Sequence, residues 1–382
     1  MRTIPFRPIL CIAVLLVFLA GCKSGEKLFN KGRYHAAVLT FVKKLQKRPN
    51  DDAANRLLSQ AYEHAAQESE SKVSDLLRSN NQFKWEAVRN EYNSMQALYQ
   101  AIHSSPAALK LVQPKDYRNA ITGAQENAAE ARYSAGVTLL RQGDKNSARQ
   151  AFDEFSNALK LVSNYKDAAQ LRDQAYERGV VNVMLSKLEV RSPYYQFTAN
   201  QFRDYLIREL QQGQVNRFVQ FYDEEDARQD NIRPDEFIDM NFFDFVIGET
   251  YVDRLQKEVS KDIPVKTVKD TTGKETTIYQ TVKATLFITT KTVVSKGLLD
   301  YQITDANNGK VLRADRIPGS YTWRNQFGTY KGDERALSDE DKKLMGGRDI
   351  PPPPPADLFI AFTQPIYANL LRDLQSFYTS LP

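Results

Sequence analysis

The hydrophobic pattern of this 382-residue chain changes its period near Val180. Before that point, residues 24–180 are rich in Ala, Gln, Glu, Lys and Leu, and their apolar side chains recur three and four positions apart, as in amphipathic helices. After it, residues 180–190 are rich in apolar and β-branched side chains, as in a buried strand. The sequence therefore predicts an α+β chain with a helical part first and a mixed α/β part second.

An internal repeat at a constant offset of 111 residues organises the helical part. The matched motifs are Gly25-Glu-Lys-Leu28-Phe29-Asn-Lys-Gly32 with Ala37 and Phe41, and Gly136-Val-Thr-Leu139-Leu140-Arg-Gln-Gly143 with Ala148 and Phe152. Small residues at helix contacts, a Gly at the turn and an aromatic on the second helix resemble the tetratricopeptide repeat. Residues 83–105 resemble a degenerate third copy. The resemblance implies an α-solenoid of about three helical hairpins that binds proteins or acts as a spacer, and a purely structural helical domain stays open as the alternative.

The first half of the α/β part alternates strands with helices. After the strand at 180–190 we expect an amphipathic helix with Phe202, Tyr205, Leu206 and Leu210 on one face. A strand at 215–222 follows, then a helix opened by Pro234 and a strand at 243–251. This order predicts an α/β arrangement of the sandwich type.

Longer strands are predicted at 281–294, 297–304 and 311–317. On the first of these, Val282, Ala284, Leu286 and Ile288 share one face. The last two are joined by Asn307-Asn308-Gly309-Lys310, and Asn-Gly is a strong hairpin signal because both residues tolerate positive φ.

Residues 346–382 start with two glycines and the five prolines 351–355. Such a run forms a stiff extended segment that serves as a spacer or as a docking motif, and both interpretations stay open. A final helix is expected to pack on the sheet, because its large apolar residues fall on one stripe. They are Phe359, Phe362, Ile366, Leu370, Leu374 and Phe377.

In the order of its elements, the segment 180–382 resembles the domain shared by the curli-secretion lipoprotein, the lipoprotein activators of penicillin-binding proteins and the amino-terminal part of the Tol-system translocation protein. The resemblance rests on the helix 202–210 with the following strand, on the phrase Asp244–Glu249 that leads a strand, and on Ile303–Leu312 around the Asn-Gly turn. It implies a domain that binds proteins and has no catalytic activity.

The amino terminus carries an apolar run of twelve residues, Ile9–Ala20, behind two arginines. At 1.5 Å per residue this run is too short to cross a ~30 Å hydrocarbon layer as a helix, so 1–21 is expected to be a cleaved signal peptide. The adjoining Leu19-Ala-Gly-Cys22 resembles the bacterial lipobox, in which this Cys carries acyl chains such as palmitate. Lys23, in place of Asp, favours the outer membrane by the same resemblance. A secreted protein that merely begins with Cys is the alternative.

Composition excludes several function classes. Without the leader, Cys22 is the only cysteine, so neither an internal disulfide nor a thiolate metal site can form. The 50 basic and 47 acidic residues that remain are interspersed, which argues against nucleic acid as a partner. His35, His64 and His103 lie singly in the helical part, and the acidic run 223–226 is expected to be a solvated loop. We expect no enzymatic activity, no metal and no cofactor. The predicted domains are 1–21, 22–179, 180–345 and 346–382.

Four aromatic residues remain as binding candidates, since exposed aromatics anchor protein partners and sugars, although strand-bound Tyr and Trp are also common in cores. They are Tyr194, Tyr195, Tyr321 and Trp323. The functional hypothesis is a non-enzymatic, membrane-anchored bacterial lipoprotein that binds an envelope protein as scaffold or accessory of a machine for secretion, wall synthesis or envelope integrity. A glycan- or nutrient-binding surface lipoprotein is the alternative. The oligomeric state and the membrane face stay open.

Overall fold

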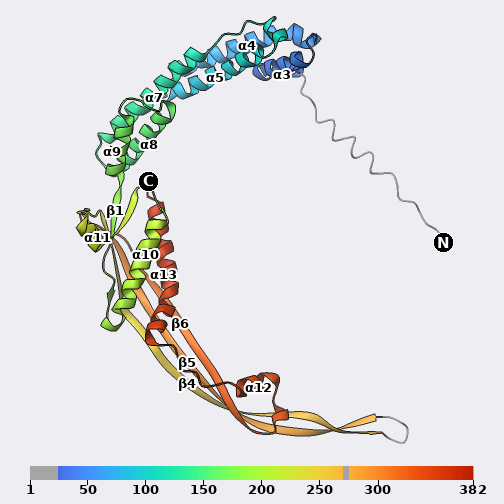
Figure 1. Ribbon diagram of the computed structural model, residues 1–382, viewed down its shortest axis with the longest axis vertical. Helices are drawn as coiled ribbons and strands as arrows, with labels where there is room; N and C mark the ends of the chain where they lie inside the picture. The colour runs from blue at the N-terminus through green and yellow to red at the C-terminus, as the bar shows by residue number, and fades with distance from the viewer. Residues whose placement is uncertain (1–24, 270–274, 382) are drawn as a thin grey trace, which may run out of the picture. The chain divides into compact units, whose positions relative to one another are not determined.

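A computed structural model describes residues 25–269 and 275–381 of the chain. The described chain has an α+β fold in which helices come first and a mixed sheet with its own helices follows (Figure 1). It divides after Gly179 into a helical unit and a sheet unit. Cys22 lies outside the described residues.

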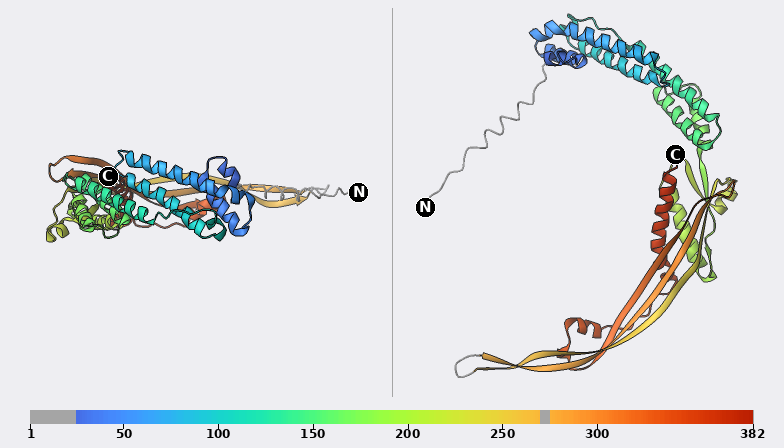
Figure 2. Two further views of the ribbon diagram at one scale, coloured as in Figure 1. Left: turned by 90° about the horizontal axis from the view of Figure 1, so that it is seen from above. Right: turned by 180° about the vertical axis from the view of Figure 1, so that it is seen from behind.

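Short turns reverse the chain between successive helices of the helical unit, so neighbours in sequence are neighbours in space (Figures 1 and 2). Helices α3 and α4, α4 and α5, α5 and α7, α7 and α8, and α8 and α9 are in contact. The elements are α2 (Gly25–Phe29), α3 (Tyr34–Lys47), α4 (Asp52–Arg78), α5 (Lys84–His103), α6 (Pro106–Leu109), α7 (Arg118–Leu140), α8 (Lys145–Leu161) and α9 (Ala168–Gly179).

The two repeat turns close their helices in the way the repeat predicts. Gly32 and Gly143 have φ angles of +68° and +83°, a left-handed conformation that glycine adopts without steric cost. After Gly143, the Asp144 side chain accepts a hydrogen bond of 2.9 Å from the Ser147 N–H and caps α8. The conformation of these turns is therefore determined by local residues and can be predicted from the sequence.

Glycine also allows the helices of each repeat to touch. A Cβ at Gly25 would lie 2.4 Å from the Phe41 ring, and one at Gly136 would lie 2.8 Å from the Phe155 ring. Both rings are fully buried. The aromatic that packs on the glycine of the second copy is thus Phe155, one helical turn beyond the expected Phe152, which is only half-buried.

The segment 83–105 is not a third hairpin, because α5 continues unbroken for 20 residues. The polar stretch before it is also helical, and α4 extends for 27 residues to Arg78. Its polar residues find partners there: Lys72 pairs with Glu68 at 2.8 Å, and buried Ser69 meets His35 Nε2 at 3.0 Å. These contacts pair polar side chains of α4 with partners on the same or a neighbouring helix.

The sheet unit is built on one mixed sheet with the strand order β3-β1-β4-β5-β6, and β2 pairs with β4 off this path. Strand β1 is parallel to β3 and β4, whereas β5 runs antiparallel to both of its neighbours, β4 and β6. The strands are β1 (Val181–Leu185), β2 (Glu189–Val190), β3 (Val219–Asp223), β4 (Glu236–Lys269), β5 (Glu275–Asp305) and β6 (Val311–Gly332).

Strands β4 and β5 are longer than predicted, with 34 and 31 residues. Bulges between Asn241 and Asp244 and between Val246 and Glu249 let β4 continue where the alternation of its side chains is interrupted. Gly248 lies in the second bulge with φ of +75°. The predicted turn between β5 and β6 is confirmed, with Gly309 at φ +69°.

Helices α10 (Gln196–Gln212) and α13 (Pro355–Thr379) pack against the sheet and enclose the core of the unit (Figure 1). The predicted stripe of α13 is buried from Phe359 to Leu374, and at its end Tyr378 takes the buried place expected for Phe377. The helix comes very close to β6, because a Cβ at Gly319 would lie only 2.4 Å from the Phe362 carbonyl oxygen.

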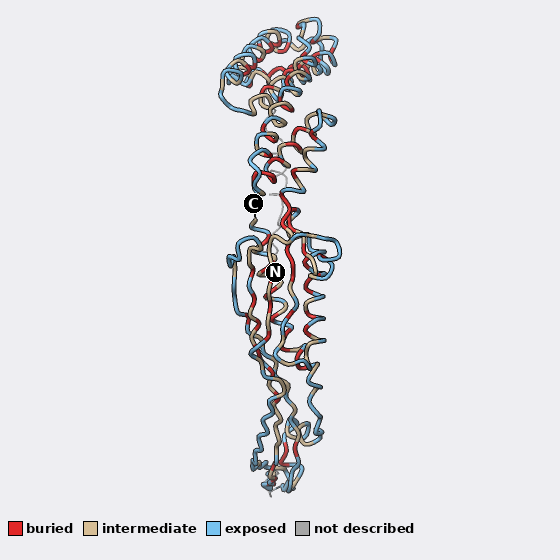
Figure 3. The backbone as a smooth tube through the Cα atoms, turned by 90° about the vertical axis from the view of Figure 1, so that its left-hand side faces the viewer, coloured by how far each residue is buried: buried red, intermediate tan, exposed pale blue. Residues whose placement is uncertain are grey.

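Short elements cover part of the sheet near the β4–β5 hairpin. The 3-10 turn η3 (Glu334–Ala336) packs Ala336 on Val282 and Ala284 of β5, and α12 (Asp339–Met345) follows with a capping box at Ser338. The chain then crosses the outer edge of β6, where Asn325 Nδ2 donates to the Arg348 carbonyl at 3.3 Å and Asn325 Oδ1 accepts from the Ile350 N–H at 3.2 Å. The end of the β4–β5 hairpin stays almost wholly exposed (Figure 3).

Two predicted elements differ from the structure. Pro234 does not open a helix; it precedes β4, where the missing N–H costs no ladder bond and pairing with β1 determines the conformation. The acidic run 223–226 is not a loop, because the Asp223 side chain accepts from the Glu225 N–H at 2.6 Å and caps α11 (Glu224–Gln229). Carboxylates in the first turn also suit the helix dipole.

Candidate functional site

An apolar groove runs between α10 and α13. The two helices point in the same direction, since Tyr195 stacks on Phe359 with 5.2 Å between ring centroids near their starts and Phe202 meets Tyr367 at 5.4 Å further along. The groove is open to solvent and encloses about 420 Å³. It is lined by Thr198, Gln201, Phe202, Tyr205, Ile360, Thr363, Gln364 and Tyr367.

Helical periodicity gives α10 two different faces. Phe197, Gln201 and Tyr205 are four residues apart and share one side of the helix. Phe197 and Tyr205 are 73% and 57% exposed, and Ile360 of α13 is 51% exposed. The sequence placed Tyr205 on the core stripe, but α10 contacts β2, β3 and α13, and its remaining side, with Tyr205, faces outward. The core stripe consists of Ala199, Phe202, Leu206, Ile207 and Leu210.

Ring contacts hold the groove side chains in place. The Phe202 and Tyr367 rings meet edge to face at 89°, and the Arg208 guanidinium lies 4.6 Å from the centroid of the Tyr205 ring. Burial raises the pKa of Tyr367 above that of an ordinary tyrosine, which is itself neutral in the physiological range. The groove therefore presents fixed, uncharged aromatic surface with a cation at its rim.

The predicted aromatic residues lie in two places. Tyr194 is 69% exposed at the start of α10, and its ring contacts that of Tyr195 at 4.9 Å. Tyr195 packs on the core, and burial raises its pKa. Tyr321 and Trp323 are half-buried on β6, opposite Ser295 and Val293, and Tyr321 packs against the core. The structure brings Tyr194 and Tyr195 together near the groove and leaves Tyr321 and Trp323 on another element.

The sequence analysis did not identify the groove residues Ile360 and Tyr367 or the exposed Phe197 on the same side of α10, and it assigned Tyr205 to the core. A signal was present in the spacing of Phe197, Gln201 and Tyr205, which falls outside the stripe through Phe202 and Leu206. The contribution of α13 could not be anticipated, because it depends on two helices separated by more than 140 residues lying side by side.

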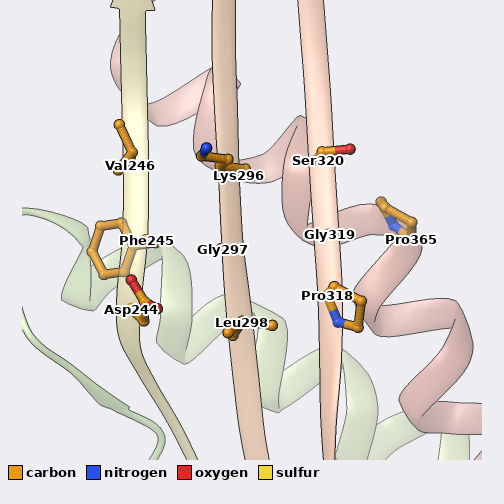
Figure 4. Close-up of a pocket in the computed structure, with 10 residues that line it drawn as sticks. All are labelled: Asp244, Phe245, Val246, Lys296, Gly297, Leu298, Pro318, Gly319, Ser320 and Pro365. Atoms are coloured by element: carbon orange, nitrogen blue, oxygen red, sulfur yellow. The ribbon is translucent and has the colours of Figure 1, made fainter.

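A second hollow of about 540 Å³ lies where β4 is bulged (Figure 4). Its floor consists of rows of paired residues: Val246, Lys296 and Ser320 form one row, and Asp244, Leu298 and Pro318 form the next. Gly297 and Gly319 stand between the rows, and Pro365 of α13 completes the lining. The hollow is shallow and of mixed polarity.

An adjoining polar hollow on the same strands contains one ion pair and one hydrogen-bonded carboxylate. Asp300 Oδ1 lies 2.8 Å from Arg316 Nε, and Asp239 accepts a hydrogen bond of 2.6 Å from the Ser186 hydroxyl. Within the described ranges, no three His, Cys, Asp or Glu side chains gather in a way that could hold a metal ion. This surface offers recognition by polar groups.

The histidines of the helical unit are engaged in packing. His35 lies between Ser69 and Ser94, with 3.0 Å and 3.2 Å to its two ring nitrogens, and burial lowers its pKa. Ser69 also donates to Glu91 at 3.3 Å, but it is only 2% exposed, so a substrate cannot reach this hydroxyl. His64 stacks on Tyr34 and His103 lies against Tyr99.

In the described part of the chain, no helix combines the length and the apolarity that crossing a membrane requires. No protein-family model matches the sequence, and no curated protein matches it. Among solved structures, a Helicobacter pylori protein described as a neuraminyllactose-binding hemagglutinin homolog matches at 11% identity and a TM-score of 0.25, over 51% of this chain and 84% of that one. A similarity of this size carries no argument about function.

Proposed function

We propose that this protein is a non-enzymatic, membrane-anchored lipoprotein that binds an envelope protein through the groove between α10 and α13. The observation that carries the proposal is the exposure of Phe197, Tyr205 and Ile360 on two helices whose other sides form the core. Large apolar side chains on a fixed scaffold are typical anchors of protein interfaces, and little entropy is lost when they bind. The fold itself does not need these side chains.

The shape of the groove fits an amphipathic helix of the partner. Two parallel helices form its walls, so a third helix can lay its apolar face along Tyr205, Ile360 and Tyr367. Thr198, Gln201 and Gln364 then supply the polar rim that protein interfaces need. In this proposal the protein works as a scaffold or accessory of a machine for secretion, wall synthesis or envelope integrity.

Cys22 supplies the anchor in this proposal. A single acyl chain holds a protein only marginally, whereas several chains at one residue hold it stably. Replacing it, as in Cys22→Ala, should abolish lipid labelling and leave a larger precursor that keeps its signal. Mutant protein of normal size that stays on the membrane would contradict the anchor.

Site-specific crosslinking in living cells tests the groove. A photo-reactive amino acid at Tyr205 should give a discrete adduct with one protein, and Ile360→Glu in the same chain should remove that adduct. The matched control places the probe at Val311 of β6, which is 49% exposed. An adduct that forms equally at Val311, or none at Tyr205, contradicts the proposal. Binding of a glycan that Tyr205→Ala abolishes, without any protein adduct, would favour the alternative of a glycan-binding lipoprotein.

A further inference from the structure

Strand β4 has hydrogen-bonded neighbours on both sides only near its start. On one side it pairs with β5 as far as Lys269. On the other side β1 pairs with residues 236–238 and β2 with residues 241–242. From Phe245 to Lys269 the described chain provides no second neighbour. Such an edge presents a row of unpaired backbone N–H and C=O groups, which is a template for a further strand.

The two outer edges of the sheet differ from this one. The edge of β6 is crossed by residues 347–350, which bond to Asn325, and Gly347 packs so close that a Cβ there would lie 3.1 Å from the Gln326 carbonyl oxygen. The edge at β3 is only five residues long. Proteins commonly cover or shorten edges in these ways. Within the described residues the open part of β4 is neither covered nor short, although Lys257, Lys261 and Pro264 lie along it.

Exposed apolar side chains accompany the open edge. Tyr251, Val252 and Leu255 are 53%, 50% and 55% exposed. They lie where β4 is the outermost strand, and η3 and α12 cover only part of this region. A sheet of only two or three strands with apolar side chains exposed to water is marginally stable, and pairing with a further strand increases its stability.

We infer that a second copy of this chain covers this edge, with the two β4 strands antiparallel around a two-fold axis at Lys257. In this register Leu255 faces Val259 of the other copy, Asp253 faces Lys261 and Tyr251 faces Ile263, and each pair occurs twice. All six side chains lie on one face of the strand, because residues alternate between faces. On this face apolar side chains thus meet apolar ones and carboxylates meet ammonium groups, the combinations that stabilise cross-strand pairs, whereas on the other face Val252 lies opposite Asp262.

Neighbouring registers lose this complementarity. Moving the axis by one residue in either direction places Leu255 opposite a lysine, Lys257 or Lys261, and places Asp253 opposite an apolar side chain. At the axis the two Lys257 side chains approach each other, but each has a carboxylate of its own copy nearby. Hydrogen bonds from Ser338 and the charge of Lys257 lower the pKa of Asp341 on α12. On the face that carries Leu255 and Val259, the pattern of charges on β4 therefore favours the register with its axis at Lys257.

Cysteine crosslinking of the full chain in bacterial cells tests this register. Residues that face each other in antiparallel strands have Cα atoms about 4.5–5.5 Å apart, which a disulfide can span. Lys257→Cys should therefore shift the protein from monomer to dimer on a non-reducing gel after mild oxidation. The parent chain, with Cys11 and Cys22 only, gives the background.

Lys261→Cys is the matched control, since it changes the same residue type on the same strand and face. Its two copies would be eight residues out of register, about 27 Å apart, and should give no dimer. Asp253→Cys combined with Lys261→Cys should restore the dimer band. A monomeric Lys257→Cys chain, or Lys261→Cys crosslinking as readily, overturns the inference. Because these positions lie outside the α10–α13 groove, the adduct from Tyr205 tests the proposed function separately.

Discussion

Replacement of Gly319 by Ala should strongly destabilise the sheet unit. This glycine stands on β6 directly beneath α13, opposite Gly297 of β5. An added Cβ would lie 2.4 Å from the Phe362 carbonyl oxygen and 2.5 Å from a side-chain carbon of Ile366. The first of these atoms belongs to the helix backbone, so rotation of a side chain cannot relieve the clash.

The size of the effect follows from the shift that is needed. An ordinary contact lies at 3.4 Å or more, so α13 and β6 must separate by about 1 Å near the clash. Overpacking of a core costs about 1–3 kcal/mol, and we expect a value near the upper end, about 3 kcal/mol, because the helix carries a stripe of fully buried side chains. For a unit of this size that corresponds to a melting point lower by about 6–12 °C.

Urea unfolding followed by tryptophan fluorescence measures this change in one unit. The chain has two tryptophans, Trp85 and Trp323, so a Trp85→Phe background leaves Trp323 on β6 as the reporter of the sheet unit. Gly346→Ala is the matched control, because its nearest atom would be the Lys342 carbonyl oxygen at 3.5 Å. If Gly319→Ala and Gly346→Ala unfold at the same urea concentration, the close approach of α13 to β6 is wrong.

Three further predictions concern the two units. In the helical unit, Gly143→Val should lower the free energy of unfolding by about 1 kcal/mol or more, because its φ is +83°. Gly123→Ala should raise the free energy of unfolding by about 0.5–1 kcal/mol, because no atom lies within 4 Å of the new Cβ. Urea unfolding followed by Trp85 fluorescence checks both. Burial raises the pKa of Tyr117 to about 12, whereas a tyrosine in the unfolded chain ionises at about pH 10. The helical unit should therefore lose stability as the pH rises from about 10 to about 12. In unfolding curves measured across this pH range, Tyr117→Phe should make the loss smaller. Deletion of residues 346–382 should abolish cooperative melting of the sheet unit. Each buried residue of the α13 stripe contributes about 1.5–3 kcal/mol, whereas the total free energy of unfolding of a protein is only about 5–15 kcal/mol. Unchanged melting would contradict the packing of α13 on the sheet.

Elements whose signals are local were predictable from the sequence. The stripe of α13 depends on spacings of three and four residues within one helix, and its members from Phe359 to Leu374 are buried as expected. The turn at Gly309 and the helix ends at Gly32 and Gly143 depend on the φ freedom of single residues. None of these features needs a distant partner.

The continuity of the long strands was not predictable, because glycine has more than one role. Gly297 was interpreted as the start of a separate strand, and the strand predicted through Gly248 was expected to end at Tyr251. In the structure Gly248 occupies a bulge, and Gly297 leaves room for Phe245 and Phe362. Pro234 was interpreted as a helix start for the same reason, since only pairing of β4 with β1 decides its conformation. Tertiary contacts override the local preference in each case.

The groove and the open edge occupy different parts of the sheet unit, and this separation has a consequence for binding. Groove residues belong to α10 and α13, which pack on the part of the sheet that contains β1, β2, β3 and the start of β4. Residues 251–263 of β4 extend beyond this part. Two copies joined through β4 would each keep an open groove, so one assembly would offer two partner sites. A partner that is itself clustered in a membrane then binds with an effective concentration that a single site cannot reach.

Leu255→Asp, which places a carboxylate against Val259 of the other copy, should weaken capture of such a clustered partner in pull-downs. It should leave the one-to-one adduct from Tyr205 unchanged. Equal loss of both signals would show that the edge supports the fold of the groove and does not join two copies.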